Sequence, residues 1–281
     1  MKISVITVCY NAAQTIERTI RSVIHQTAFD KIEYIIIDGA STDGTVDIVR
    51  KHQDKIAVFV SEADSGIYNA MNKGIKIATG DYIHFLNAND FYDNVDVIDE
   101  IVKVADGYKA DFIIGDVVLV TSDGQKEYRS NKNINAYTLF SDWIYHVTLF
   151  AKTDLFRKYG CFDESYKIAS DNDWIFPLIL DRNIKKAYIE KVIAEFKLDG
   201  ISAREDSKKQ TILELEKVLA KNFRGQNDFL RRILHHKIFN QYSSPLHRIC
   251  NKIVRKMGLK KLLIKLITKK QDWEIKYCNV N

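Results

Sequence analysis

Four short segments rich in acids and amides could together bind a polar ligand. Each of them follows a run of β-branched or other apolar residues. They are Cys9-Tyr10-Asn11, the segment from Asp38 to Thr45, Glu62-Ala63-Asp64-Ser65-Gly66 and Asn87-Ala88-Asn89-Asp90. One such segment alone would most often be a turn or a helix cap. Four of them favour a site that hydrogen-bonds a base and a ribose and holds a diphosphate through a cation.

The glycines of these segments do not form a known phosphate-binding loop. Gly39 and Gly44 have the outer spacing of the kinase-type loop, but Thr45 occupies the position that needs lysine, and the Gly-x-Gly-x-x-Gly pattern is absent. These observations argue against kinases, ATPases and nicotinamide-dependent dehydrogenases. A nucleotidyltransferase stays open as an alternative, although it would normally carry a Gly-rich Arg/Lys loop near the first strand.

Alternating strands and helices must position the four segments. Apolar runs predict strands at residues 3–9, 34–37, 57–61 and 82–86, and amphipathic stretches predict helices at residues 15–26, 46–52 and 67–78. The second strand is apolar without alternation, as in a sheet that helices cover on both faces. We therefore expect an α/β fold with a mostly parallel central sheet and with the four segments at its carboxyl edge, where ligands of such sheets bind.

The order and spacing of several motifs resemble the family-2 glycosyltransferases with the GT-A fold. The motifs are Thr7 to Asn11, Ile37 to Thr45, Ile67 to Gly74, Gly80 to Asp90, His146, Gly160 to Glu164, Ser170 to Trp174 and Gly200-Ile201-Ser202. The resemblance implies a Rossmann-like GT-A catalytic domain in residues 1–203, with a nucleotide-sugar-binding half at 1–100 and an acceptor half at 101–203. A helical region at 204–281 would follow it.

By this resemblance the donor nucleotide would lie against the first half of the chain. Asp38 would accept a hydrogen bond from the ring N–H of the base, and Asp64 would lie near the base and the ribose. The other expected donor-binding residues are Thr7, Cys9, Tyr10, Asn11, Asn87, Ala88 and Asn89. Residues 87–90 correspond to the family's Asp-x-Asp motif, which holds a divalent metal, Mg or Mn, against the diphosphate.

The chain departs from the family pattern at three acidic positions. Asn87 and Asn89 replace the acids of the Asp-x-Asp motif, so Asp90 and Asn89 are the expected metal ligands. Asn69 replaces a third acid. An amide oxygen ligates a hard cation without charge, so we expect weaker metal binding and a direct contact between a basic side chain and the diphosphate. The candidates for that contact are Lys73 and Arg204.

Transfer of a glycosyl group to a hydroxyl needs a base for the hydroxyl proton and stabilisation of the leaving diphosphate. The resemblance places the base at Asp171, just before an amphipathic helix predicted at residues 174–180, and one displacement would invert the anomeric carbon. In the alternative interpretation, Asp171 and Asp173 only complement the positive end of that helix.

The acceptor is expected to contact two side chains of the second half, His146 at the edge of the pocket and Trp174 through its flat ring. Trp143 offers a second flat face. Each of the two tryptophans is at least as often a core residue. The Gln-x-x-Arg-Trp motif of processive members does not follow Trp174, so we expect an enzyme that adds a single sugar.

The C-terminal region has its own charge pattern. The chain of 281 residues carries a net charge of +5, yet residues 229–271 contain twelve Lys and Arg and no acid, which leaves −7 for the rest. A helix at 212–223 is expected to pack on the catalytic domain, and basic amphipathic helices are expected at 246–257 and 259–267. Three roles stay open for them: packing on the core or on a second subunit in a homodimer, binding an anionic membrane surface, and, least favoured, binding nucleic acid.

Composition limits the location of the protein. Its four cysteines are scattered without metal-ligand spacing, no apolar run reaches the roughly 18 residues of a membrane span, and no signal-peptide pattern is present. We therefore expect a cytoplasmic enzyme that works at the inner membrane face. It would move a hexosyl or N-acetylhexosaminyl group from a nucleotide-diphospho-sugar, most simply a UDP-sugar, to a glycan or polyprenyl-diphosphate-linked acceptor in surface polysaccharide biosynthesis. The alternative is a catalytically degenerate domain that binds a nucleotide or a glycan.

Overall fold

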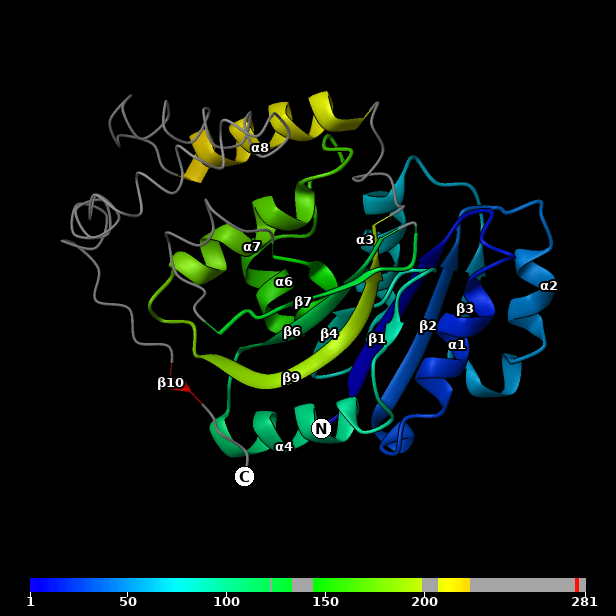
Figure 1. Cartoon of the computed structure of the whole chain (residues 1–281), viewed down its shortest axis with the longest axis horizontal. Coiled ribbons are helices and arrows are strands. Elements are labelled where there is room, and N and C mark those ends of the chain that lie inside the picture. Colours follow the sequence, from blue (N-terminus) through cyan, green and yellow to red (C-terminus); the bar gives the residue numbers. More distant parts are fainter. Residues whose placement is uncertain (122, 133–143, 199–206, 223–275, 278–281) are drawn as a thin grey trace.

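The computed structural model describes residues 1–121, 123–132, 144–198, 207–222 and 276–277. Its centre is one curled sheet in which neighbouring strands follow the order β10-β9-β6-β8-β4-β1-β2-β3 (Figure 1). The strands are β1 (Ile3–Cys9), β2 (Ile32–Asp38), β3 (Val58–Ser61), β4 (Tyr82–Phe85), β5 (Phe91–Tyr92), β6 (Phe112–Val120), β7 (Lys126–Arg129), β8 (Leu149–Lys152), β9 (Lys186–Lys197) and β10 (Lys276–Tyr277). The expected α/β fold is confirmed.

The sheet is mostly parallel, with one antiparallel strand between its two halves. Strands β1 to β4 pair in parallel, and so do β6, β9 and β10, while β8 runs antiparallel to both β4 and β6. Strand β5 pairs with β9, and β7 pairs with β6, both antiparallel. The antiparallel strand β8 therefore brings the acceptor half of the chain beside the end of β4.

Helices cover both faces of the sheet. They are α1 (Ile16–Ile24), α2 (Thr45–Arg50), α3 (Ile67–Ile77), α4 (Val97–Tyr108), α6 (Thr153–Tyr159), α7 (Ser170–Leu180) and α8 (Lys208–Asn222), with 3-10 turns at η1 (Phe29–Lys31), η2 (Gln53–Lys55) and η3 (His146–Thr148). The strands and helices predicted within the first 86 residues are all present, with ends that differ by a few residues. The periodic spacing of apolar residues was therefore sufficient to predict these strands and helices.

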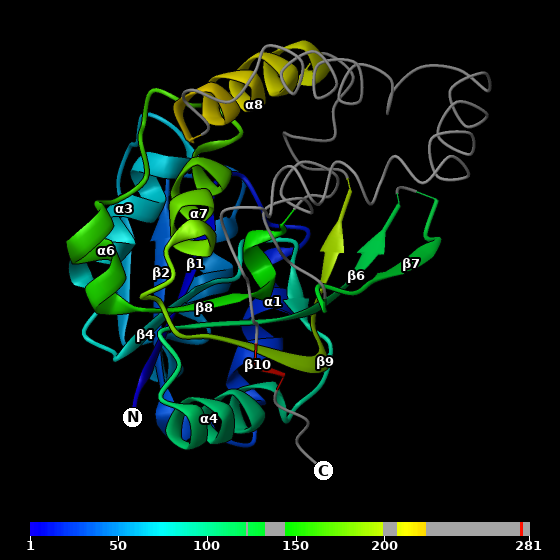
Figure 2. The ribbon, with the colours of Figure 1, turned by 90° about the vertical axis from the view of Figure 1, so that its left-hand side faces the viewer.

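Alternate residues of each strand enter two separate cores. Ile6 and Val8 of β1 pack with α3, α6 and α7, whereas Val5 and Cys9 pack with α1 and α4. Figure 2 shows α3, α6 and α7 together on one side of the molecule. Both faces of β1 are thus apolar, which explains why its sequence shows no alternation.

Helix α7 is buried on all sides in its first turn. Most of its later residues are buried as well. Nine of its residues are buried, including Ser170, Asp171, Asn172 and Asp173. Helix α8 lies above α7 in Figures 1 and 2 and contacts it through the ion pair between Lys221 and Asp173. The expectation of an amphipathic helix that starts at residue 174 was therefore wrong, because a helix from the C-terminal region covers the face that the sequence assigned to solvent.

Helix α8 packs on the catalytic domain, as expected for the helix predicted at residues 212–223. Its Val218 has no exposed surface and belongs to the core of α3, α6 and α7. The helices expected at 246–257 and 259–267 lie outside the described residues, and the domain boundary at residue 203 stays a prediction. Within the described part of the chain, no helix is both long enough and apolar enough to cross a membrane.

Candidate functional site

The carboxyl ends of β1, β2 and β3 lie side by side. Cys9 pairs with Asp38 in the β1–β2 register, and Asp38 pairs with Ser61 in the β2–β3 register. The loops after these strands therefore start from one edge of the sheet, as the sequence predicted. Each loop can contribute to one shared site.

Asp38 organises these loops from a fully buried position. Its Oδ2 accepts hydrogen bonds from the Ser41 amide (3.0 Å) and the Ser61 hydroxyl (2.7 Å), and its Oδ1 accepts from the Ser41 hydroxyl (2.5 Å). The side chain has 0% exposed surface. In this conformation Asp38 exposes no surface to a base and holds the loop, so its expected hydrogen bond to the base stays a prediction.

Two other expected donor contacts are also buried. Thr7 has 0% exposed surface, and its hydroxyl donates to the Leu86 carbonyl (2.8 Å). Burial, and then the Asp38 carboxylate, raises the pKa of the Cys9 thiol, which stays protonated and donates to Asp38 Oδ1 (3.5 Å). The side chains of Thr7 and Cys9 therefore support the end of β1 from inside the core, and the expected contact of these two residues with the donor stays a prediction.

The loops after β1 and β2 are tied to each other. The Asn11 side-chain oxygen accepts from the Thr42 amide (3.0 Å), and the Asn11 amide donates to the Ser41 hydroxyl (2.8 Å). Asp43 accepts from the Ala13 amide (2.9 Å). Asn11 has a φ of 46°, a left-handed conformation that asparagine tolerates. Asn11 thus fixes the geometry of the binding edge and remains exposed beside it.

Tyr10 and Asp64 form an open platform over this edge. Tyr10 is 67% exposed, and Asp64 is partly exposed. A Cβ at Gly39 would lie 2.6 Å from Asp64 Oδ2 and 3.3 Å from the Tyr10 ring, so a larger residue there would force the Asp64 carboxylate to shift. A flat ring next to a carboxylate suits a heterocyclic base with an adjoining ribose.

The turn at residues 87–90 follows β4 and is held by the neighbouring strand and helix. The Ala88 amide donates to the Val8 carbonyl (3.1 Å), and the Thr19 hydroxyl of α1 donates to the Asp90 carbonyl (2.8 Å). Asn89 has a φ of 110°, a strained conformation for a residue with a side chain. Strain of this kind persists only where the surroundings enforce it, so this turn has a fixed geometry.

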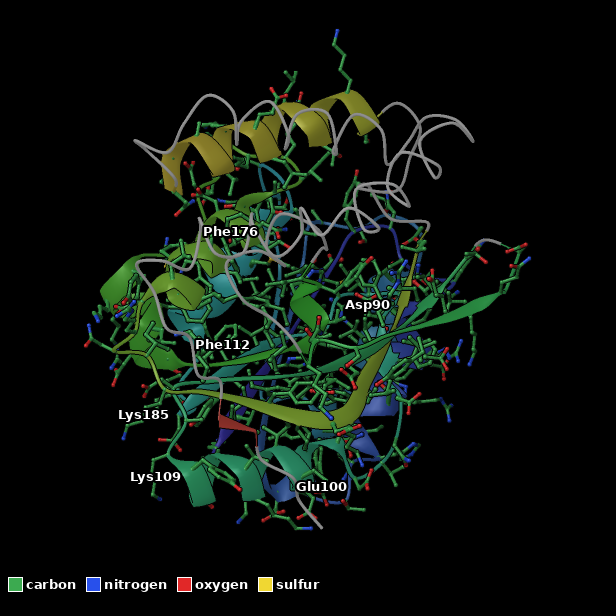
Figure 3. All side chains as sticks on the ribbon, turned by 60° about the vertical axis from the view of Figure 1, so that its left-hand side comes forward. Asp90, Glu100, Lys109, Phe112, Phe176 and Lys185 are labelled. Carbon is green, nitrogen blue, oxygen red and sulfur yellow. The ribbon has the colours of Figure 1, made fainter. Side chains whose placement is uncertain are left out.

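His146 connects this turn to the acceptor half of the chain. Its Nε2 lies 2.9 Å from Asn87 Nδ2 and 3.9 Å from Asp90 Oδ2, and its Nδ1 lies 3.7 Å from Asp171 Oδ2. Figure 3 shows Asp90 beside the strands, far from Glu100 on α4 and from Lys109, the residue after that helix. One imidazole therefore lies between the carboxylate of the expected metal site and the carboxylate expected to act as the base.

Asp171 has one carboxylate oxygen held by neighbours and one directed toward the site. Its Oδ1 accepts from the Asn172 amide (2.9 Å), the Asn172 side chain (3.2 Å) and the Tyr68 hydroxyl (3.2 Å). Among the described residues no hydrogen bond reaches Oδ2, which faces His146. Burial and the Asp171 carboxylate raise the pKa of Tyr68 well above its ordinary value, so this hydroxyl stays a donor.

The turn at residues 87–90 offers oxygen ligands for a hard cation. Asp90 supplies a carboxylate that is 5% exposed. The buried side-chain oxygen of Asn87 accepts no hydrogen bond within the part of the chain that the structure describes. No group of three His, Cys, Asp or Glu at metal-binding spacing occurs among these residues. An unsatisfied buried carbonyl beside one carboxylate fits a divalent ion that takes its remaining ligands from a diphosphate.

The structure places Trp174 in the core. Its ring is 6% exposed and stacks on Phe156 with the centroids 4.1 Å apart, and its indole N–H donates to the Gly160 carbonyl (2.7 Å). The expectation that Trp174 contacts an acceptor was wrong, because its ring packs in the core between the sheet and helices α3, α6 and α7. Trp143 and Arg204 lie outside the described residues.

The structure explains one departure from the family pattern, Asn69, and shows where the candidate contact Lys73 lies. Asn69 and Asn72 of α3 both donate to the Glu164 carboxylate, at 2.9 Å and 2.8 Å, and these hydrogen bonds lower the pKa of Glu164. Asn69 therefore contacts a loop of the acceptor half rather than the diphosphate site. The Lys73 ammonium binds Glu62 Oε1 (2.8 Å) and the Ala63 carbonyl (2.9 Å), which corrects its expected contact with the diphosphate.

The sequence did not predict the buried residues that support the site. Tyr68 lies in one of the family motifs, and its hydroxyl contacts Asp171. Thr19 is a polar residue on the apolar face of α1, between Ile16, Ile20 and Val23. A threonine on such a face is the signal that could have identified it, because a buried hydroxyl needs a partner.

Comparison with known proteins gives consistent matches. The model of the family described as "Glycosyl transferase family 2" matches residues 4–169. An uncharacterized glycosyltransferase of Mycobacterium tuberculosis is 29% identical over 213 residues, 73% of this chain and 78% of the relative. A PGL/p-HBAD biosynthesis glycosyltransferase of Mycobacterium bovis is 26% identical over 198 residues, 69% of this chain and 75% of the relative.

Solved structures match most of the chain. S. aureus TarS 1–349 in complex with UDP-GlcNAc has a TM-score of 0.65 at 19% identity and covers 86% of this chain and 72% of its own. The mannosyltransferase PcManGT from Pyrobaculum calidifontis, in complex with GDP-Man and Mn2+, has a TM-score of 0.60 at 19% identity and covers 92% and 80%. These matches confirm the expected GT-A fold.

Proposed function

The chain belongs to glycosyl transferase family 2, and we propose that it transfers one sugar from a UDP-sugar to a glycan hydroxyl with inversion at the anomeric carbon. The observation that carries this proposal is the position of His146 between two carboxylates. Asp90 Oδ2 lies 3.9 Å from His146 Nε2 on the side of the donor loops, and Asp171 Oδ2 lies 3.7 Å from His146 Nδ1 on the other side. One imidazole thus joins the donor side of the site to the acceptor side, so a donor and an acceptor bound beside it would lie close to each other.

The donor half supports a nucleotide. The Tyr10 ring would lie against the base, Asp64 would accept hydrogen bonds from the ribose, and Asn11 would fix the loop between them. TarS, a structural neighbour, was solved with UDP-GlcNAc and with UDP, which makes uridine the first choice for the base. Asn89 and the Ala88 backbone, in the fixed turn after β4, would face the diphosphate.

A divalent ion is proposed at the same turn, held by Asp90 together with the amide oxygens of Asn87 and Asn89. When bound, it would neutralise charge on the diphosphate as the bond to the sugar breaks. With a single carboxylate among its protein ligands, its affinity should be low without nucleotide and should rise when the diphosphate adds charged oxygens.

The acceptor hydroxyl would be activated by Asp171. Oδ2 takes the hydroxyl proton while the acceptor oxygen forms its bond to the anomeric carbon, and the diphosphate leaves with the electron pair of the old bond. Tyr68 and Asn172 hold Oδ1 and thereby orient Oδ2. The His146 ring, whose Nε2 lies beside Asn87, stands between the two carboxylates and closes one side of the reaction space. One displacement inverts the anomeric centre.

The acceptor is proposed to be a glycan on a lipid carrier at the cytoplasmic face of a membrane. The support is the basic amphipathic pattern of residues 229–271, and the fact that a relative is named for PGL/p-HBAD biosynthesis. Removal of residues 244–281 should then reduce both flotation with anionic vesicles and activity on a lipid-linked acceptor. Unchanged flotation and activity would exclude the membrane role.

The function can be tested with a panel of nucleotide-sugars. We expect a UDP-sugar to raise the melting temperature and to release UDP in the presence of Mn2+ and a glycan acceptor, and EDTA to weaken both effects. Binding of UDP-sugars without turnover on any acceptor would favour the degenerate binding domain instead. Tighter binding of GDP-sugars would overturn the choice of uridine.

A further inference from the structure

Glu214 of α8 reaches into the protein and binds three consecutive backbone amides. Its Oε1 accepts from the Lys167 amide (2.8 Å), and its Oε2 accepts from the amides of Ile168 (2.8 Å) and Ala169 (3.0 Å). The Gln210 side chain, one turn earlier in α8, donates to Oε1 (2.8 Å). With four donors and 5% exposed surface, this carboxylate is a fully satisfied buried anion.

The three amides directly precede the helix that carries the expected base. Helix α7 begins at Ser170, and Ala169, which caps it, makes no side-chain capping hydrogen bond. Successive amides that point the same way form an anion-binding nest, and the adjacent helix N-terminus adds positive potential. A carboxylate from a distant part of the sequence therefore fixes the entry into α7.

A short chain of contacts connects Glu214 to Asp171. The Ile168 peptide is held on its N–H side by Glu214, and its carbonyl accepts from the Tyr68 hydroxyl (2.6 Å). The same hydroxyl lies 3.2 Å from Asp171 Oδ1. A shift of the Ile168 peptide would move the hydroxyl that orients the carboxylate.

The packing of α8 keeps Glu214 in place. Val218, one turn later, is completely buried in the core, and the Lys221 ammonium binds Asp173 Oδ2 (2.6 Å) on the first turn of α7. In Figure 3, Phe176 of α7 lies directly below α8. Helix α8 therefore contacts the first half of α7 through an apolar residue, an ion pair and the buried carboxylate.

We propose that Glu214 is a positioning residue for glycosyl transfer. Helix α8 would then contribute to the active site, although α8 lies outside residues 4–169, the part of the chain that the family model matches. Glu214 acts on the backbone of residues 167–169 and, through Ile168 and Tyr68, on the orientation of Asp171. The proposal rests on the role of Asp171 in the proposed function. Burial acts to raise the pKa of Glu214, but the hydrogen bonds from Gln210 and the three amides outweigh it and hold the pKa below its ordinary value, so the anion persists at neutral pH.

The test is the isosteric Glu214→Gln variant of the full chain, with Lys209→Ala on the exposed side of α8 as a matched control. Hydrogen exchange of the amides at 167–169 reports the backbone directly. Steady-state kinetics with the UDP-sugar and acceptor give kcat and the donor KM, and a melting curve gives stability. We expect faster exchange at 167–169, a fall in kcat of about tenfold or more because charge-assisted hydrogen bonds are lost, and a donor KM within about twofold of wild type.

Wild-type exchange at 167–169 or a wild-type kcat in Glu214→Gln would overturn the proposal. A parallel fall of kcat and rise of donor KM would also contradict it, because it would indicate a general loss of structure. Should Glu214→Gln fail to fold, Gln210→Ala leaves the carboxylate in place but removes one donor, and it must show the same pattern at smaller amplitude. Activity in Asp171→Asn would defeat the proposed function itself, whereas an inactive Asp171→Asn beside a fully active Glu214→Gln would defeat this inference alone.

Discussion

The hydroxyl of Tyr68 gives the sharpest test of how the base is oriented. Replacement by phenylalanine removes a single oxygen and keeps the ring, which packs on Phe162 with the centroids 5.6 Å apart. The lost hydroxyl donates to the Ile168 carbonyl (2.6 Å) and lies 3.2 Å from Asp171 Oδ1. A buried carbonyl left without its donor costs about 1–3 kcal/mol, so Tyr68→Phe should lower the free energy of unfolding by about 2 kcal/mol.

The same variant should also slow turnover. Asp171 Oδ1 would lose one of its three donors, and if that donor contributes about 1 kcal/mol to orientation, kcat falls about fivefold. The donor KM should stay unchanged, because Tyr68 contacts neither Tyr10 nor Asp64. Urea denaturation and initial rates at saturating acceptor measure the two effects.

Tyr92→Phe is the matched control for this variant. The Tyr92 side chain is also buried, but its hydroxyl has no hydrogen-bond partner among the described residues. Its removal should leave stability and kcat unchanged or slightly raise stability, because no hydrogen bond is broken. Wild-type stability and kcat in Tyr68→Phe, or equal losses in both variants, would refute the reasoning.

Three further predictions concern the loops, the metal and pH. Asn72→Ala removes two hydrogen bonds to the Phe162 backbone, at 2.9 Å and 3.0 Å, and should cost about 2–4 kcal/mol of unfolding free energy in urea; a loss below about 0.5 kcal/mol would contradict this role. Asn87→Asp adds a carboxylate beside Asp90 and should lower the Mn2+ concentration that half-saturates UDP binding in calorimetry; an unchanged Mn2+ dependence would exclude Asn87 as a ligand. The lowered pKa of Glu214 gives stability that is complete above its ordinary value of 4.5 and is lost as pH falls through the lower folded value. The stability gap between wild type and Glu214→Gln should therefore shrink as the pH falls below 4.5, and a constant gap would be inconsistent with the ionised contact.

Much of the fold followed from local patterns, because each strand and helix of the first half has a clear apolar period. The order of loops along the sheet edge followed as well, since parallel strands bring their carboxyl ends together. Which residue types line the edge was harder to predict. Thr7 and Asp38 have polar side chains of the kind that bind ligands. Whether such a side chain is buried depends on the direction in which it points at the end of its strand.

The centre of the site depends on contacts between distant segments. His146 reaches Asn87 because β8 pairs antiparallel with β4, with Tyr82 opposite Lys152, and no local pattern encodes that pairing. Glu214 reaches residues 167–169 because α8 folds back over α7. A lone glutamate in a predicted helix carries no signal of such a contact, so only the structure could identify it.

The most direct measurement of the central claim compares wild type and Asp171→Asn for turnover and for UDP affinity in the same buffer with Mn2+. The amide keeps the shape of the side chain and an oxygen for the Tyr68 and Asn172 donors, but it cannot take a proton. We expect the rate of sugar transfer to fall by about a factor of 10²–10⁴, the usual contribution of a general base, with UDP affinity unchanged. A variant that still transfers sugar at a rate close to wild type would contradict Asp171 as the base and, with it, the proposed reaction geometry.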